Sequence, residues 1–185
     1  MNKKYITELS LGVNGVFAEG AVAIGASLKD KKYLEVFNFK KNEIGLQGMK
    51  ALEEVLTLSK TVKELNLSGN NIGDEGVSII IKAMIKKTKQ SLNVLSLSDN
   101  KITSKGCKTI CEFINKCGCL QELQLSNNEI DNDGAKALVT VLKNKKQFNN
   151  IDIDNNHISG DTLHELFNML PLRNLNLLKN TLNDE

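Results

Sequence analysis

The sequence contains no tryptophan, a single proline (Pro171), and aromatic residues at only 4%. Because it also has no run rich in glycine and serine, nothing indicates a linker, and we expect a single domain over residues 1–185. No stretch approaches the roughly 20 apolar residues that a membrane-spanning helix needs. A net charge of +2 and few aromatics to stack on bases argue against a nucleic-acid partner.

Seven asparagines recur instead with a nearly constant period, in steps of 28, 28, 30, 28, 28 and 24 residues. Before each of them stands the pattern apolar-x-x-apolar-x-apolar-x-x-Asn, so that repeats start near residues 6, 34, 62, 92, 120, 148 and 172. A fixed period of this length is typical of solenoids. The asparagines are Asn14, Asn42, Asn70, Asn100, Asn128, Asn156 and Asn180.

Two periodicities alternate within each repeat. Apolar residues two apart, such as Leu65 and Leu67, indicate a short strand that turns one face to the core. Further on, apolar residues at helical spacing, such as Leu138, Val141 and Leu142, predict an amphipathic helix. Each repeat is thus a strand, a tight loop and a helix, and strands repeated in one direction pair in parallel.

The spacing that recurs in the repeats indicates structural roles for the asparagine and for a glycine that follows it. A buried asparagine amide can satisfy the backbone groups of its own loop and of the neighbouring loop. The glycine, six residues later, fits a corner where a side chain would clash or where φ is unusual. The sixth repeat has Thr162 at this position. The glycines of the first five repeats are Gly20, Gly48, Gly76, Gly106 and Gly134.

The segments LNLSGNNIGDEG (65–76) and LQLSNNEIDNDGAKALVTVL (123–142) resemble ribonuclease-inhibitor-like leucine-rich repeats. The resemblance covers essentially the whole chain, as about six full repeats of 28 residues and a partial seventh. It implies an α/β solenoid, a right-handed arc with parallel strands on the concave face and helices on the convex face. Related proteins include ribonuclease inhibitor, Ran GTPase-activating proteins, tropomodulin-like actin regulators and innate immune receptors, so the resemblance does not select one activity.

We expect a non-catalytic module that binds a protein partner through the concave face. Side chains between the leucines point out of this face, which is polar and has almost no aromatic anchor of the kind that dominates tight interfaces. Its carboxylates favour a partner with basic groups. The predicted contact residues are Glu8, Asn38, Lys40, Glu64, Asn66, Ser96, Glu122, Gln124, Asn150, Asp152, Asp154, Asn174 and Asn176.

The alternative is a GTPase-activating or other regulatory protein, which the Ran GTPase-activating relatives imply. No residue matches such a site well enough to be assigned to it. The two histidines, His157 and His164, lack a nucleophile and carboxylate in a motif, and no phosphate loop or metal motif is present. We therefore expect no enzyme activity, no cofactor and no metal.

The four cysteines all fall in the fourth repeat, as Cys107, Cys111, Cys117 and Cys119. Their spacing is not a familiar zinc spacing, and they do not link distant repeats. Four free thiols indicate a reducing compartment. We expect a cytoplasmic protein, and the sequence is also compatible with a bacterial protein that acts inside a host cell.

Lysines gather at the ends of the predicted helices. They interact favourably with the helix dipole and increase solubility, or they form a weak contact with an acidic surface. The lysines are Lys29, Lys31, Lys32, Lys82, Lys86, Lys87, Lys89, Lys143, Lys145 and Lys146. Neither end has an obvious capping segment. The chain is then a fragment of a longer protein, or its last strand is a minimal cap. A monomer or a weak end-to-end dimer fits both.

Overall fold

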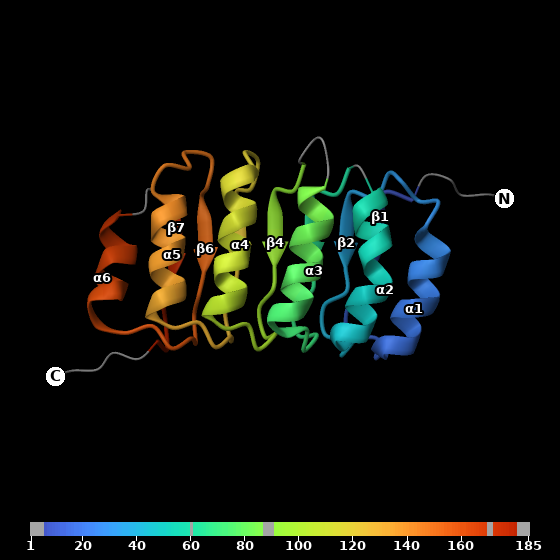
Figure 1. Ribbon diagram of the computed structural model, residues 1–185, viewed down its shortest axis with the longest axis horizontal. Coiled ribbons are helices and arrows are strands. Elements are labelled where there is room, and N and C mark those ends of the chain that lie inside the picture. The colour runs from blue at the N-terminus through green and yellow to red at the C-terminus, as the bar shows by residue number, and fades with distance from the viewer. Residues whose placement is uncertain (1–5, 60, 87–90, 170–171, 181–185) are drawn as a thin grey trace.

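One parallel sheet runs through the whole molecule, with one strand from each repeat. The computed structural model describes residues 6–59, 61–86, 91–169 and 172–180. Within these residues the sheet has seven strands in chain order, from β1 to β7 (Figure 1). The strands are β1 (Glu8–Ser10), β2 (Val36–Asn38), β3 (Glu64–Asn66), β4 (Val94–Ser96), β5 (Glu122–Gln124), β6 (Asn150–Asp152) and β7 (Asn174–Asn176).

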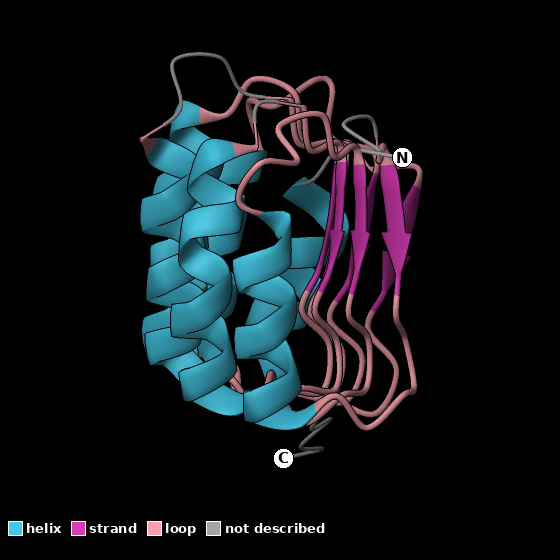
Figure 2. Cartoon of the chain, turned by 90° about the vertical axis from the view of Figure 1, so that its right-hand side faces the viewer, coloured by secondary structure: helices cyan, strands magenta, loops and turns pink. Residues whose placement is uncertain are grey.

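The helices form a second layer that covers one face of the sheet (Figure 2). Each helix packs against the next along the chain. This alternation of strands and helices confirms the predicted α/β solenoid. The helices are α1 (Phe17–Leu28), α2 (Gly45–Leu58), α3 (Gly73–Ile85), α4 (Ser104–Lys116), α5 (Asn132–Leu142) and α6 (Gly160–Met169).

The core lies between the two layers and follows the predicted apolar pattern. The central residue of each strand pairs with the same position of the next strand, as Leu65 does with Leu95 and Leu95 with Leu123. These side chains are almost fully buried from β2 to β6 and partly buried in the end strands β1 and β7. In the second repeat Phe37 and Phe39 take the leucine positions, with ring centroids 4.8 Å apart.

The asparagine ladder forms as predicted. The Nδ2 atom of Asn100 donates to the carbonyl of Leu67 in the preceding repeat at 2.9 Å, and to Leu97 and Ser98 in its own repeat at 3.1 and 3.0 Å. Its Oδ1 atom accepts from the backbone N–H groups of Asn70 and Ile72 at 3.0 and 3.4 Å. Each buried amide thus joins two consecutive loops, which sets the spacing between repeats.

The repeated glycine is explained by a clash and not by an unusual φ. These glycines lie in the first turns of the helices, four residues after an isoleucine or valine of the loop. A Cβ atom on Gly48 would lie 2.6 Å from Cβ of Ile44, and one on Gly134 would lie 2.7 Å from Cγ2 of Ile130. The missing side chain therefore lets the first helical turn close over the loop.

The loops that lead into the helices have two conformations, which the sequence analysis missed. In the second and third repeats the helix starts at a glycine with positive φ, Gly45 or Gly73. In the fourth and fifth repeats the same position holds an extended N-cap residue, Thr103 or Asp131. In these four repeats the conformation follows the residue three positions after the ladder asparagine, because a left-handed backbone favours glycine whereas Thr and Asp favour N-caps. In the first repeat Phe17 takes a positive φ at this position.

In the second conformation neighbouring repeats cap each other's helices. Oδ1 of Asp74, in α3, accepts from the backbone N–H groups of Thr103 and Gly106 at 2.9 and 3.0 Å. One repeat further on, the hydroxyl of Ser104 donates to the carboxylate of Asp131 and accepts from the N–H of Gly134 at 3.0 Å. These bonds satisfy N–H groups that a helix start leaves free.

The stability that Asp131 contributes should decrease in acid. The hydrogen bond from Ser104, followed by backbone N–H groups of Gly134 and Asp133, lowers the pKa of Asp131 in the folded protein. Its contribution is therefore complete above the unfolded-state pKa of about 3.9 and is lost as the pH falls through the lower folded-state pKa. Asp131→Ala should cost about 1 kcal/mol at neutral pH, and the difference from wild type should shrink in acid. Urea unfolding over a pH series measures it, and a constant difference would refute the assignment.

Candidate functional site

The predicted contact residues lie on the face of the sheet opposite the helices, here called the strand face. Their positions form two columns across the paired strands. The first column runs through the first residue of each strand: Glu8, Val36, Glu64, Val94, Glu122, Asn150 and Asn174. The second runs through the third residue: Ser10, Asn38, Asn66, Ser96, Gln124, Asp152 and Asn176. Lys40 and Asp154 follow the second column by two residues.

Part of the second column holds the backbone where the strands end. The side-chain oxygens of Asn38, Asn66, Asp152 and Asn176 accept from the backbone N–H two residues further on, at 3.0 to 3.3 Å. The Nδ2 atoms of the three asparagines bind no other group within the described residues. The strand face therefore presents free amide donors whose orientation the backbone fixes.

At the C-terminal half of the strand face a hydrogen-bonded chain crosses β5, β6 and β7. The carboxylate of Glu122 accepts from Nε2 of Gln124 at 2.6 Å and from Nδ2 of Asn150 at 3.2 Å. Asn174 then donates to Oδ1 of Asn150 at 2.8 Å. These residues, together with Asp152 and Arg173, line a hollow of about 540 Å³. The acidic groups here are held in place before any partner binds.

Two residues behave differently from the rest of the predicted set. Ser96 is only 3% exposed, because its short side chain lies between the longer Asn66 and Gln124 in the same column. We therefore leave Ser96 out of the contact surface. Asp154 is partly exposed, but its Oδ1 atom is buried and has no hydrogen-bond partner within the described residues.

Replacing Asp154 should stabilise the free protein. Ser68, Ser98 and Ser126 occupy the same position in other repeats, so Asp154→Ser fits the fold. Removal of a buried acceptor without a partner should raise the free energy of unfolding by about 1 kcal/mol. Urea denaturation at neutral pH measures the change. A loss of stability would instead show that water satisfies Oδ1 in solution.

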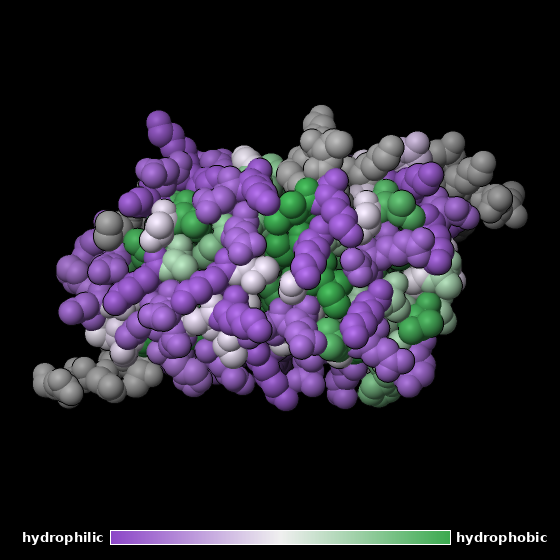
Figure 3. All heavy atoms as spheres, in the orientation of Figure 1, coloured by the Kyte–Doolittle hydropathy of each residue, from purple (hydrophilic) through white to green (hydrophobic). Residues whose placement is uncertain are grey.

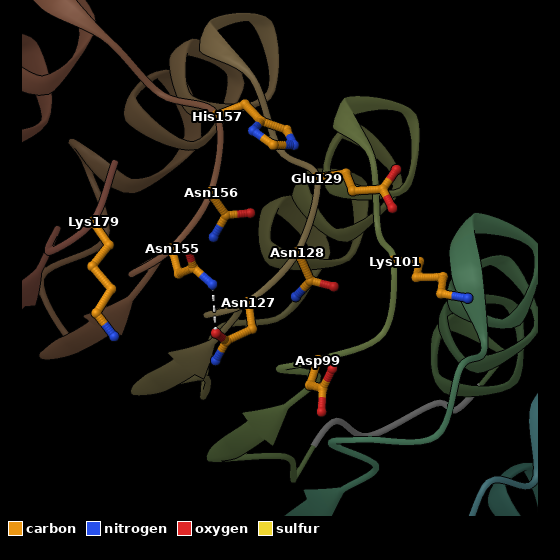
Figure 4. Close-up of a pocket in the computed structure, with 9 residues that line it drawn as sticks. All are labelled: Asp99, Lys101, Asn127, Asn128, Glu129, Asn155, Asn156, His157 and Lys179. Atoms are coloured by element: carbon orange, nitrogen blue, oxygen red, sulfur yellow. Dashed lines mark hydrogen bonds between the residues drawn. The ribbon is translucent and has the colours of Figure 1, made fainter. Parts of the chain in front are cut away.

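A second hollow, of about 670 Å³, lies at the edge where the strands lead into the loops (Figure 4). Nδ2 of Asn155 donates to Oδ1 of Asn127 at 2.7 Å, beside the ladder. The sequence placed His157 in a loop but did not reveal the hollow. The polar residues on both sides of each ladder asparagine are the feature of the sequence that indicates it. The lining has mixed charge and no serine or cysteine: Asp99, Lys101, Asn127, Asn128, Glu129, Asn155, Asn156, His157 and Lys179.

The helix side of the molecule is mainly hydrophilic (Figure 3). Several of the predicted lysines are exposed there, and some have acidic neighbours. The ammonium of Lys29 lies 2.7 Å from Glu54, and that of Lys86 lies 3.8 Å from Glu53. Lys87 and Lys89 lie outside the described residues. This surface is therefore less basic than the number of lysines suggests.

The described residues contain no group of three or more His, Cys, Asp or Glu side chains arranged to hold a metal ion. All four cysteines are free thiols, and three of them are buried. None of the helices in the described segments is long and apolar enough to cross a membrane.

A family model described as "Leucine Rich repeat" matches residues 58–80, 88–111 and 116–139. These three matches follow the strand–helix period seen in the structure. The chain therefore carries leucine-rich repeats. Solenoids of leucine-rich repeats generally offer an extended concave surface for binding. The ribonuclease-inhibitor-like subtype and the number of repeats stay predictions.

Two solved structures are similar to this chain. The structure titled "Leiomodin-1 Actin-Binding Site 2 (ABS2)" is 19% identical to it, with a TM-score of 0.64, and the match covers 81% of this chain and 85% of that one. A protein from Bacteroides fragilis is 13% identical, with a TM-score of 0.45, over 98% of this chain and 68% of that one. No curated protein matches the sequence.

Proposed function

We propose that this chain is a non-catalytic interaction module of the ribonuclease-inhibitor-like subtype, which binds a protein partner with basic groups through its strand face. One observation carries the proposal: carboxylates that the fold holds in place gather on β5 and β6. Glu122 and Asp152 lie on neighbouring strands two residues out of register, and Asp154 follows two residues later.

The electrostatics of these groups favour a cationic ligand. Glu122 accepts two hydrogen bonds from neutral amides, which fix its position without neutralising its charge. Asp154 is only partly exposed, and the exposed part of its carboxylate can face a lysine or arginine of a partner. Charge-assisted hydrogen bonds of this kind are among the stronger polar contacts.

The same surface argues against a very tight complex. Interface hot spots are enriched in Trp, Tyr and Arg. The strands β1 to β7 contain none of these residue types, and Arg173, which precedes β7, lines the hollow beside them. Binding would therefore depend on charge and amide hydrogen bonds, and should weaken as salt screens the carboxylates.

Affinity capture from cell extract tests the proposal with three baits. The first is the wild-type chain. The second, the neutral variant, carries Glu64→Gln, Glu122→Gln, Asp152→Asn and Asp154→Ser. These changes preserve the fold by design, because Asn and Ser already occupy the last two positions in other repeats. The third, a matched control, removes the same charge from the helix side with Glu19→Gln, Asp30→Asn, Glu75→Gln and Glu112→Gln, at positions that are all exposed.

A partner held by the wild type and the control but lost by the neutral variant supports the proposal. A partner held equally by all three baits places binding elsewhere, on the helix side or at the second hollow, where the strands lead into the loops. Purified actin is one defined protein to test in the same way, because the similar leiomodin-1 structure is an actin-binding site. Circular dichroism confirms that each bait is folded.

A further inference from the structure

Two thiols meet in the turn between α4 and β5. Cys117 is the C-cap residue of α4, and its backbone N–H donates to the carbonyl of Phe113 at 2.8 Å. Only Gly118 separates it from Cys119. The two Sγ atoms lie 3.1 Å apart, and both face the carbonyl of Leu92, at the start of the same repeat, at 3.9 and 3.3 Å.

In other repeats hydroxyl groups occupy the positions of these thiols and donate the corresponding hydrogen bonds. In the preceding turns Ser59 and Thr61 donate to the carbonyl of Leu34 at 3.2 and 3.0 Å, and Ser91 donates to that of Val62 at 2.7 Å. A thiol is a much weaker donor than a hydroxyl. The turn after α4 therefore has weaker hydrogen bonds than the turns with hydroxyl groups, and holds two sulfur atoms in contact instead.

We propose that Cys117 and Cys119 form a dithiol site that closes reversibly to a disulfide by exchange with a low-molecular-weight disulfide such as glutathione disulfide. The Sγ atoms need to approach by only about 1 Å to reach the S–S bond length of about 2.05 Å. Gly118 between them is exposed, and a Cβ atom there would meet nothing within 4 Å. The turn thus has room, and a flexible residue, for the change in dihedral angles.

Exposure sets the order of the two steps. Cys119 is partly exposed whereas Cys117 is buried, so the thiolate of Cys119 attacks the small disulfide and releases one small thiolate. The thiolate of Cys117 then attacks the mixed disulfide at Sγ of Cys119 and releases the second. The protein loses two protons and two electrons, and the small disulfide is reduced to two thiols. Burial, followed by the hydrogen bond with Cys117, raises the pKa of Cys119 to about 12, so exchange should accelerate as the pH rises.

Cys107 and Cys111 provide an internal control. Both lie in α4 and are buried, and the Cys107 thiol donates to the carbonyl of Gly134 at 3.5 Å. Trypsin separates the three sites, because Lys105, Lys108, Lys116 and Lys136 place Cys107, Cys111 and the Cys117–Cys119 pair on different peptides.

The test incubates the folded full-length chain in buffers of increasing glutathione disulfide to glutathione ratio, alkylates the remaining thiols and analyses the tryptic peptides by mass spectrometry. We expect peptide 117–136 to lose both alkylation sites without a glutathione adduct, and to regain them after reduction, while Cys107 and Cys111 stay alkylated. Cys117→Ser should instead accumulate a stable glutathione adduct on Cys119.

Several results would overturn the proposal. An unstructured peptide of residues 106–136 shows at which ratios of glutathione disulfide to glutathione the two cysteines are oxidised without the fold. Full alkylation of Cys117 and Cys119 in the folded chain at all of these ratios would be the first such result. Another is a lasting glutathione adduct on the wild-type chain, and a third is equal oxidation of all four cysteines. Circular dichroism of Cys117→Ser, which restores the hydroxyl found at Ser59, shows that the variant is folded.

Discussion

Asn100→Ala should lower the free energy of unfolding by roughly 3–5 kcal/mol, because several buried backbone groups lose their partner at once. Asn100 is fully buried. It donates to three carbonyls and accepts from two N–H groups, which belong to two consecutive repeats. Alanine offers neither donor nor acceptor. Urea or thermal unfolding followed by circular dichroism measures the loss.

Asn14→Ala provides the matched control, at the same repeat position but at the end of the ladder. Asn14 is exposed, and its Nδ2 atom donates to the carbonyls of Leu11 and Gly12 at 2.8 and 3.0 Å. Because water can replace these bonds, the loss should stay below about 1 kcal/mol. Equal effects of the two substitutions would mean that burial within the ladder does not determine its energy.

Gly106→Ala should destabilise the protein by about 2 kcal/mol, although alanine in a helix is usually favoured over glycine by roughly 0.5–1 kcal/mol. A Cβ atom on Gly106 would collide with the carboxylate of Asp74 and lie 2.8 Å from Cγ2 of Ile102. The substitution would also push Asp74 away from the N–H groups that it caps. Chemical denaturation measures the sign of the effect.

Gly118→Ala is the control for this sign reversal. A Cβ atom there would meet nothing within 4 Å, and the residue does not have positive φ. The free energy of unfolding should therefore stay the same or rise slightly. Gly106→Ala as stable as wild type would show that α3 and α4 can move apart at no cost.

The fold could be predicted because one local rule repeats. Leu65 and Leu67 point to the core, the residue between them lies on the strand face, and Asn70 supplies the buried amide. Every later repeat has the same spacing and the same arrangement. The two conformations before the helices were not predicted, although the residues at 45, 73, 103 and 131 carry the signal. What could not be seen was the partner of Thr103, because Asp74 lies one repeat away and its direction depends on how the helices pack.

The candidate site could be predicted in outline only. Strand alternation correctly placed Glu64, Glu122 and Asp152 on one surface. It could not show that Ser96 is covered by its neighbours, since exposure depends on side-chain length in adjacent repeats. Nor could it show the buried oxygen of Asp154 or the contact between Cys117 and Cys119, which depend on the geometry of individual turns.

The most direct test of the central proposal is the affinity of the captured partner for the wild-type chain and for the neutral variant, measured by isothermal titration calorimetry at low and physiological ionic strength. We expect the neutral variant to bind at least about tenfold more weakly, a difference of about 1.4 kcal/mol, and to lose most of the salt dependence of the wild type. Equal affinities with equal salt dependence would contradict the assignment of binding to the strand-face carboxylates.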